Sequence, residues 1–166
     1  MNLAVGDLVV YGNHGVGRVA ARRRQDVLGE SQDVVVLELD DLTVVLPLDL
    51  AKAQLRPPAD EADLRRVVKA LRGDSPLRSG PWLSRRKETL EKLAEGTPVA
   101  LAEIVSEGAQ RDRLRVAKGQ KGQLSLSERR VFSEARELLT QEIALALEIE
   151  PAAAENWIDQ HLARPS

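Results

Sequence analysis

The sequence predicts an α+β protein: a small antiparallel β-barrel or curled sheet, followed by an all-helical domain of about five helices. Three observations support this prediction. Residues 5–48 form short β-type runs separated by Gly, Asn and Asp, whereas beyond Pro58 apolar residues recur at helical spacing. Between them, Pro57-Pro58 stops regular structure and stiffens the chain. We therefore expect two domains, residues 1–57 and 58–166.

The β-type runs lie close together in the N-terminal part. They are residues 5–11, 16–19, 34–39 and 42–46. Four or five short strands joined by tight turns are typical of a small barrel or a curled antiparallel sheet.

The C-terminal part contains start and stop signals for about five helices. Capping residues, first-turn prolines and terminal glycines occur in the order Asp60, Gly73, Gly80, Pro81, Gly96, Pro98, Ser125 and Pro151. Ser125 and Glu128 have the spacing of a capping box, which begins a long helix with an apolar stripe typical of core packing. Residues 111–123 include the Gly-rich basic run 118–122, for which we expect a surface connection, with phosphate binding as the alternative.

Composition narrows the classes of protein. The 166 residues carry a net charge of −2 and contain no cysteine, which excludes a disulfide framework and a thiolate metal site. No apolar run is long enough to span a membrane, and the first residues lack the pattern of a signal peptide, so we expect a cytoplasmic protein. An acidic chain does not coat nucleic acid by bulk charge. Any DNA contact must therefore be local and assisted by another interaction.

The sequence offers no catalytic constellation. His14 and His161 are far apart, and His14 lies in a Gly-Asn-His-Gly turn where a structural role is the simplest interpretation. Neither an acid/base pair nor a nucleophile motif is recognisable. We predict a binding protein rather than an enzyme, without metal or cofactor.

A cluster of cations follows one of the two tryptophans. Arg85, Arg86 and Lys87 fall within the first two turns of the helix that begins near Trp82. The helix dipole makes this end unfavourable for cations, by about 0.3–1 kcal/mol per charge. An external anion such as a phosphate backbone reverses that cost. The cluster therefore favours contact with an anion such as a phosphate backbone, whereas burial tendencies alone favour packing of Trp82 between helices.

A helical wheel ranks the three cations. With Leu83 and Leu90 on a buried stripe, Arg85 is expected on the solvent side and Arg86 and Lys87 at the borders of the stripe. Arg85 is accordingly the preferred residue for a phosphate contact.

The motifs of both halves resemble one family. Residues 5–11, His14 to Gly17 and residues 42–47 are similar to the RNA polymerase-interacting domain shared by the CarD/CdnL family and the transcription-repair coupling factor. Trp82 with residues 84–87 and 90–93, and later residues 124–125, 128–130 and 135–136, resemble the same family. The resemblance extends nearly from end to end.

The resemblance implies a bacterial transcription regulator. Its Tudor-like N-terminal domain would bind the β subunit lobe of RNA polymerase holoenzyme at promoters. The residue matching Trp82 would enter the minor groove at the upstream edge of the melted bubble, beside the −10 element, and stabilise the open complex. Residues matching Arg85, Lys87 and Arg129 would lie near DNA phosphates, with Arg86 beside them. The family also implies a monomer in the cytoplasm, associated with the nucleoid.

The polymerase contact implied by the family uses the second and fourth strands. Gln25 and Val45 stand where well-known members carry arginine, and Val27 keeps the apolar character. The run Arg22, Arg23 and Arg24 offers charge from neighbouring positions.

Two other functions remain as alternatives. One is an adaptor that binds polymerase and recruits another protein through its helices, with Trp82 buried. The other is an RNA-binding barrel. It is disfavoured because the barrel part has six Lys and Arg against eight Asp and Glu, and Tyr11 is its only aromatic residue.

Overall fold

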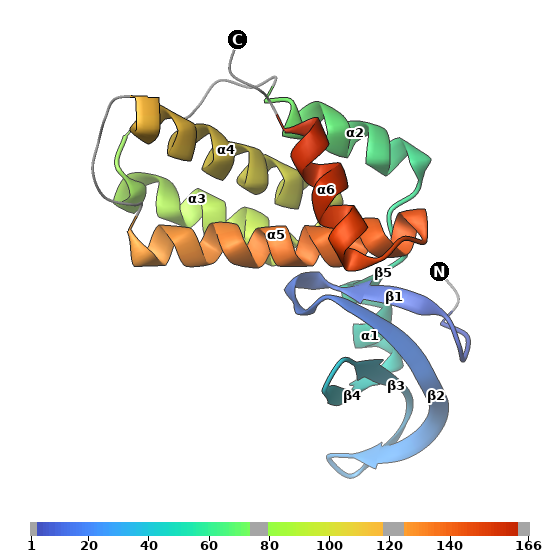
Figure 1. The fold of residues 1–166 in the computed structure, drawn as a ribbon. Helices are drawn as coiled ribbons and strands as arrows, with labels where there is room; N and C mark the ends of the chain where they lie inside the picture. The colour runs from blue at the N-terminus through green and yellow to red at the C-terminus, as the bar shows by residue number, and fades with distance from the viewer. Residues whose placement is uncertain (1–2, 74–79, 118–124, 163–166) are drawn as a thin grey trace. The chain divides into compact units, whose positions relative to one another are not determined.

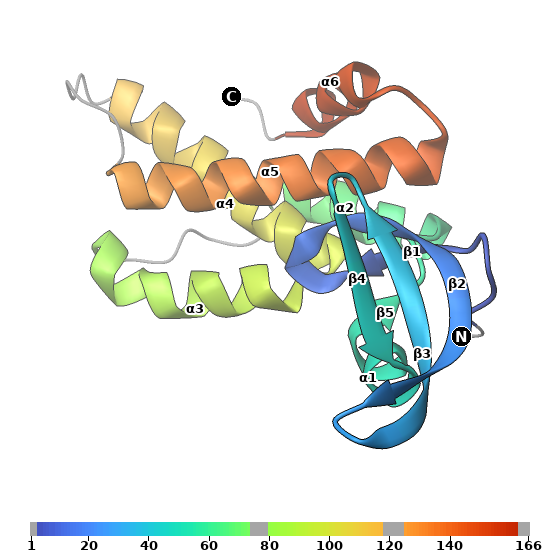
Figure 2. The same ribbon diagram turned by 90° about the horizontal axis from the view of Figure 1, so that it is seen from below.

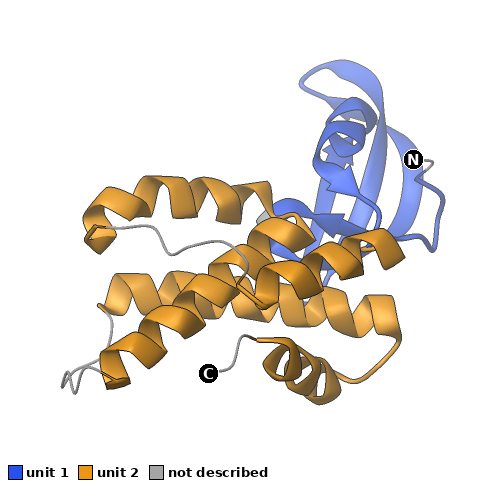
Figure 3. Cartoon of the chain, turned by 90° about the horizontal axis from the view of Figure 1, so that it is seen from above, with its two compact units in different colours: residues 1–58 blue, residues 59–166 orange. Residues whose placement is uncertain are grey.

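A computed structural model describes residues 3–73, 80–117 and 125–162. The chain divides into two compact units, Met1–Pro58 and Ala59–Ser166 (Figure 3). Among the helices in the described ranges, none is both long and apolar enough to cross a membrane.

The first unit is an antiparallel sheet of five strands in the order β4-β3-β2-β1-β5 (Figure 1). Its elements are β1 (Leu8–Tyr11), the 3-10 helix η1 (Gly12–His14), β2 (Val16–Val27), β3 (Glu30–Leu39), β4 (Leu42–Pro47), α1 (Leu48–Gln54) and β5 (Leu55–Arg56). The predicted antiparallel sheet is confirmed. Its edge strands β4 and β5 are not paired with each other among the described strands, so the sheet is curled and open rather than a closed barrel (Figure 2).

The sequence pattern underestimated β2 and β3. Residues 20–27 of β2 and 30–33 of β3 are largely polar and exposed, so no apolar alternation marks them as strands. They pair nonetheless, from Ala21 with Val36 to Val27 with Glu30, and Leu28 and Gly29 make the turn. Helix α1 and strand β5 were also not expected, because residues 48–56 are too short a stretch to establish a helical period.

Alternate residues of the strands build the core of this unit. The buried cluster consists of Leu3, Val9, Val19, Val35, Leu37, Leu46, Ala51 and Leu55. An irregularity in the β2–β3 register between Val19 and Ala21 changes which residues of β2 face this core. Beyond it, the even-numbered residue Arg22 lies opposite the core residue Val35.

The second unit is a bundle of five helices in the described ranges (Figure 1). They are α2 (Glu61–Leu71), α3 (Trp82–Glu95), α4 (Pro98–Ala117), α5 (Leu126–Leu147) and α6 (Pro151–His161). The predicted helical domain is confirmed, and so are several predicted helix ends. Asp60 caps α2 in a capping box with Asp63, and Gly96 ends α3 in the left-handed conformation, at φ 66°.

Helices α4 and α5 provide most of the core of the bundle. Its largest fully buried apolar side chains are Leu71, Leu101, Ile104, Leu139, Ile143 and Ile158. The buried carboxylate of Glu142 accepts the backbone N–H of Ala59 at 2.9 Å, so a polar group inside the bundle is satisfied.

The expected connection at residues 111–123 is wrong in its first part. Residues 111–117 continue α4, because they contain Arg, Leu and Ala, which favour helix, and neither Gly nor Pro. The run 118–122, including Lys118 and Gly122, lies outside the described residues.

Candidate nucleic-acid interface

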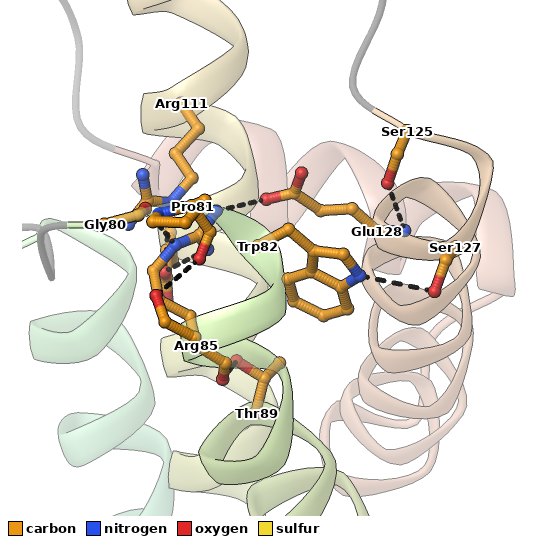
Figure 4. Close-up of polar contacts among 11 residues, drawn as sticks. Gly80, Pro81, Trp82, Arg85, Thr89, Arg111, Ser125, Ser127 and Glu128 are labelled. Atoms are coloured by element: carbon orange, nitrogen blue, oxygen red, sulfur yellow. Dashed lines mark hydrogen bonds and ion pairs between the residues drawn. The ribbon is translucent and has the colours of Figure 1, made fainter.

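Trp82 is the first residue of α3 and is half-buried against the beginning of α5. Its indole N–H donates to Ser127 Oγ at 3.3 Å (Figure 4). Its ring centroid lies 6.2 Å from that of Phe132 in a tilted arrangement. One side of the ring is therefore fixed by the protein, while part of it remains accessible.

Arg85 lies in the interior, which corrects the prediction that it faces solvent. It is 6% exposed. Its Nη1 is 3.1 Å from Glu107 Oε1, its Nη2 is 2.8 Å from Glu128 Oε1, and its Nε donates to the carbonyl of Gly80 at 3.0 Å. The guanidinium carbon also lies 5.6 Å from the centroid of the Trp82 ring. This guanidinium is engaged on all sides by protein groups.

The network continues onto two other helices. Arg111 Nε is 3.0 Å from Glu107 Oε1, one turn along α4. On α5, Ser125 Oγ accepts the backbone N–H of Glu128 at 3.2 Å, as expected for a helix cap. The Glu128 carboxylate is directed to Arg85 (Figure 4). One half of the predicted capping box thus serves the cap, and the other half joins α5 to α3.

The helical wheel failed because the buried face of α3 is partly polar. Leu83, which was expected in the core, is 84% exposed. Leu93 is buried as expected, but the other buried positions of α3 are Arg85 and Thr89, with Thr89 Oγ1 donating to the carbonyl of Arg85 at 3.1 Å. A stripe defined by apolar residues cannot include Arg85 or Thr89, whose partners come from other helices or from the backbone.

The remaining cations of the cluster are exposed at the same end of the bundle. Arg86 and Lys87 follow Arg85 on α3, and Arg129 lies on the first turn of α5. The Trp82–Ser127 hydrogen bond joins the first turns of these two helices, which begin at one end of the bundle (Figure 1). The first turn of α3 contains no acidic residue. This end therefore combines an accessible part of an indole ring, exposed cations and a helix N-terminus.

Strand register sorts the candidate residues of the first unit. Arg23 lies opposite Val34, which lies opposite Pro47, and in the next row of this face Ala21 and Val36 lie beside Val45. Residues directly opposite in a sheet share a face, and so do alternate residues of one strand. Arg23, Gln25, Val27 and Val45 therefore share one face, and Arg23 Nε donates to Gln25 Oε1 at 3.3 Å.

The other two arginines of the run point to the opposite face. Arg22 lies opposite the core residue Val35, and its Nη1 donates to the carbonyl of Leu3 at 3.4 Å. Arg24 Nη1 lies 3.8 Å from Asp33 Oδ1. The three neighbouring arginines thus do not form one surface.

The described ranges contain no candidate metal centre. No group of three or more His, Asp or Glu side chains there is arranged to hold a metal ion. His14 lies against Tyr11, with ring centroids 4.7 Å apart, at the turn where a structural role was expected.

Comparison with known proteins covers both units. Residues 3–59 match the model described as the CarD-like/TRCF RID domain, and residues 66–159 match the model of the CarD C-terminal domain. The chain belongs to the CarD family. A relative in Bacillus subtilis (strain 168), named "Putative transcription factor YdeB", is 28% identical over 142 residues, which are 84% of this chain and 88% of the relative. The resemblance seen in the sequence is confirmed, and membership of the CarD family supports a role as a transcription factor.

Proposed function

We propose that this CarD family protein regulates transcription by binding RNA polymerase holoenzyme at promoters and stabilising the open complex. Its first unit binds the lobe of the β subunit. Its second unit places Trp82 in the minor groove at the upstream edge of the bubble, beside the −10 element. The observation that supports this function best is the position of Trp82, which is held at a helix N-terminus beside exposed cations.

The anchoring of Trp82 suits a wedge. Unstacking a base step costs about a few kcal/mol, which an inserted side chain must recover through contact. A ring already fixed by Ser127 and Phe132 loses little conformational freedom when it binds. Arg85 stacks near the same ring and holds α3 to α4 and α5. We therefore assign Arg85 to positioning Trp82 rather than to a phosphate contact.

Phosphate contacts then fall to the exposed cations. Arg86 and Lys87 lie in the first two turns of α3 and Arg129 lies in the first turn of α5, and the Trp82–Ser127 hydrogen bond joins the first turns of these two helices. The N-terminus of α3 adds a favourable partial charge for a phosphate, undiminished by acidic residues in its first turn.

The first unit provides a face for polymerase. Arg23, Gln25, Val27 and Val45 share this face, and β4 is an edge strand with a free side for pairing in the described sheet. Arg22 and Arg24 border it from the opposite face. Binding there raises the effective concentration of the second unit near the promoter, which explains how a chain of net charge −2 can bind DNA.

The mechanism is a shift of population. Trp82 binds the open complex better than the closed one, and stabilises it only by that difference in affinity. No chemical step is needed, so the protein acts without catalysis or cofactor. It would act as a monomer, in the bacterial cytoplasm at the nucleoid.

The half-life of promoter open complexes tests this proposal. It is measured with a matched bacterial holoenzyme and a competitor trap, without protein, with wild type, and with Trp82→Ala. Wild type should lengthen the half-life, and Trp82→Ala should remove the effect while polymerase binding is kept. Equal half-lives with wild type and Trp82→Ala would exclude the wedge.

The adaptor function is the second candidate, because Trp82 is half-buried and its indole N–H is already bonded to Ser127. In that case the helical unit recruits another protein and the open complex is unaffected. Fluorescence quenching distinguishes the two, with Trp157→Phe leaving Trp82 as the only tryptophan. Quenching of Trp82 by a soluble quencher in the free chain supports the wedge, whereas protection of Trp82 from the quencher supports the adaptor.

A further inference from the structure

We propose that Leu83 is a second apolar residue of the DNA-binding end, and that it contacts the opened promoter beside Trp82. This inference rests on the proposed function and extends it to a residue that the family resemblance does not assign. Leu83 is the second residue of α3 and is 84% exposed. An isolated exposed leucine is ordinary in proteins, so the argument depends on what surrounds it.

Two exposed cations share the face of Leu83. Arg86 and Lys87 follow it by three and four residues on α3 and are exposed. Residues at these spacings lie side by side on a helix surface. Side chains on a helix also lean toward its N-terminus, so these cations extend toward the first turn, where Leu83 lies. This surface is complementary to DNA. The two cations and the helix N-terminus match the phosphates, and the apolar side chain matches the bases between the two phosphate backbones.

The short extent of this surface favours a nucleic-acid groove over a lipid surface. Two turns beyond Leu83 along α3, Leu90 packs against the core of the bundle and Glu91 is exposed. Membrane-surface helices need an apolar face that continues over many turns. Among the large apolar side chains of α3, Leu83 is the exposed one, and it lies in the first turn beside the half-buried Trp82.

Leu83 complements the restricted position of Trp82. The tryptophan is half-buried and fixed to α5, so only part of its ring is available to DNA. Leucine is among the side chains that proteins insert at base steps in the minor groove. Loss of about half of the burial free energy of one leucine corresponds to about a three- to tenfold shorter half-life.

The test uses the full chain with a matched holoenzyme and measures open-complex half-life with a competitor trap. The variants are Leu83→Ser, Leu83→Met and the control Val116→Ser, which removes an apolar side chain of similar exposure, 75%, from the last turn of α4. We expect Leu83→Ser to shorten the half-life about three- to tenfold, and Leu83→Met and Val116→Ser to leave it close to wild type. Thermal unfolding of Leu83→Ser should match wild type, because the side chain is exposed.

Each other outcome is decisive. If Trp82→Ala shortens the half-life and Leu83→Ser does not, the inference is wrong and the proposed function stands; the leucine then belongs to a protein contact or has no contact. An equal loss in Val116→Ser also overturns it, because the effect is then not specific to α3. If wild type itself does not lengthen the half-life, the proposed function fails and this inference fails with it.

Discussion

Arg85 of α3 and Glu128 of α5 form an ion pair of 2.8 Å inside the helical unit, where both side chains are almost completely buried. Glu107 of α4 completes the arrangement at 3.1 Å from the other guanidinium nitrogen. One cation thus joins three helices one turn away from Trp82. A buried pair of this kind contributes little net stability when intact, but breaking it leaves an uncompensated charge.

Replacing Arg85 should therefore lower the stability of the folded protein. We expect Arg85→Gln to lower the free energy of unfolding by about 3–5 kcal/mol, because Glu128 loses its ion-pair partner in a low-dielectric interior and Glu107 is left with Arg111. Urea denaturation measures this loss. The control is Arg86→Gln, an exposed neighbour on the same helix, which should change stability by less than about 0.5 kcal/mol. Similar losses in the two variants would show that Arg85 is not buried as described.

The hydrogen bond between Trp82 and Ser127 should affect function more than stability. Ser127→Ala removes an exposed hydrogen-bond acceptor, and we expect the free energy of unfolding to fall by at most about 1.5 kcal/mol. The indole ring then loses part of its fixed orientation, so the open-complex half-life should fall between those of wild type and Trp82→Ala. Ser133→Ala, an exposed serine further along α5, serves as the control. A half-life equal to wild type would remove Ser127 from the positioning of Trp82.

The fold was predictable where the sequence contains local signals. Asp60, Gly96 and Ser125 mark helix ends through their own side chains or backbone freedom, and each is found at a helix end. The site was predictable only in part. Trp82 and its basic neighbours stand out in the sequence, but the burial of Arg85 depends on carboxylates 22 and 43 residues away. No spacing within α3 reveals those partners.

The β2–β3 turn contains a strained residue. Leu28 has φ 53° and is fully exposed, at a turn position that favours Asn, Asp or Gly. Because a left-handed conformation costs roughly 1–2 kcal/mol for most residues, Leu28→Asn should raise the free energy of unfolding by about 1 kcal/mol. Leu28→Ala is the matched control, since it removes the apolar side chain but keeps the Cβ. If denaturation curves show that Leu28→Ala stabilises the protein as much as Leu28→Asn does, the left-handed conformation of Leu28 is not the source of strain.

The cap of α2 should give stability a dependence on acid. The backbone N–H of Asp63, which donates to Asp60, lowers the pKa of the Asp60 carboxyl from its ordinary value of 3.8. A lowered pKa in the folded state means that this stabilisation is present above the ordinary value and is lost as pH falls through the folded one. Asp60→Asn keeps a capping acceptor at every pH. Between neutral and strongly acidic solution, the free energy of unfolding of Asp60→Asn should therefore fall less than that of wild type. Denaturation in the two solutions measures this fall for each protein. An identical fall in the two proteins would exclude the effect.

Charge reversal on β2 separates the two faces of the sheet. Arg23 shares a face with Gln25, Val27 and Val45, whereas Arg24 lies on the opposite face near Asp33. If the first face binds the β subunit lobe, Arg23→Glu should weaken that binding by about tenfold or more, because a reversed charge at an interface costs both attraction and fit. Arg24→Glu introduces the same charge on the same strand but on the opposite face of the sheet. Its effect on binding should therefore be much smaller. Binding of the full chain to the isolated β lobe measures both dissociation constants. Because the two variants have equal net charge, a larger loss for Arg24→Glu than for Arg23→Glu would move the polymerase contact to the opposite face of the sheet.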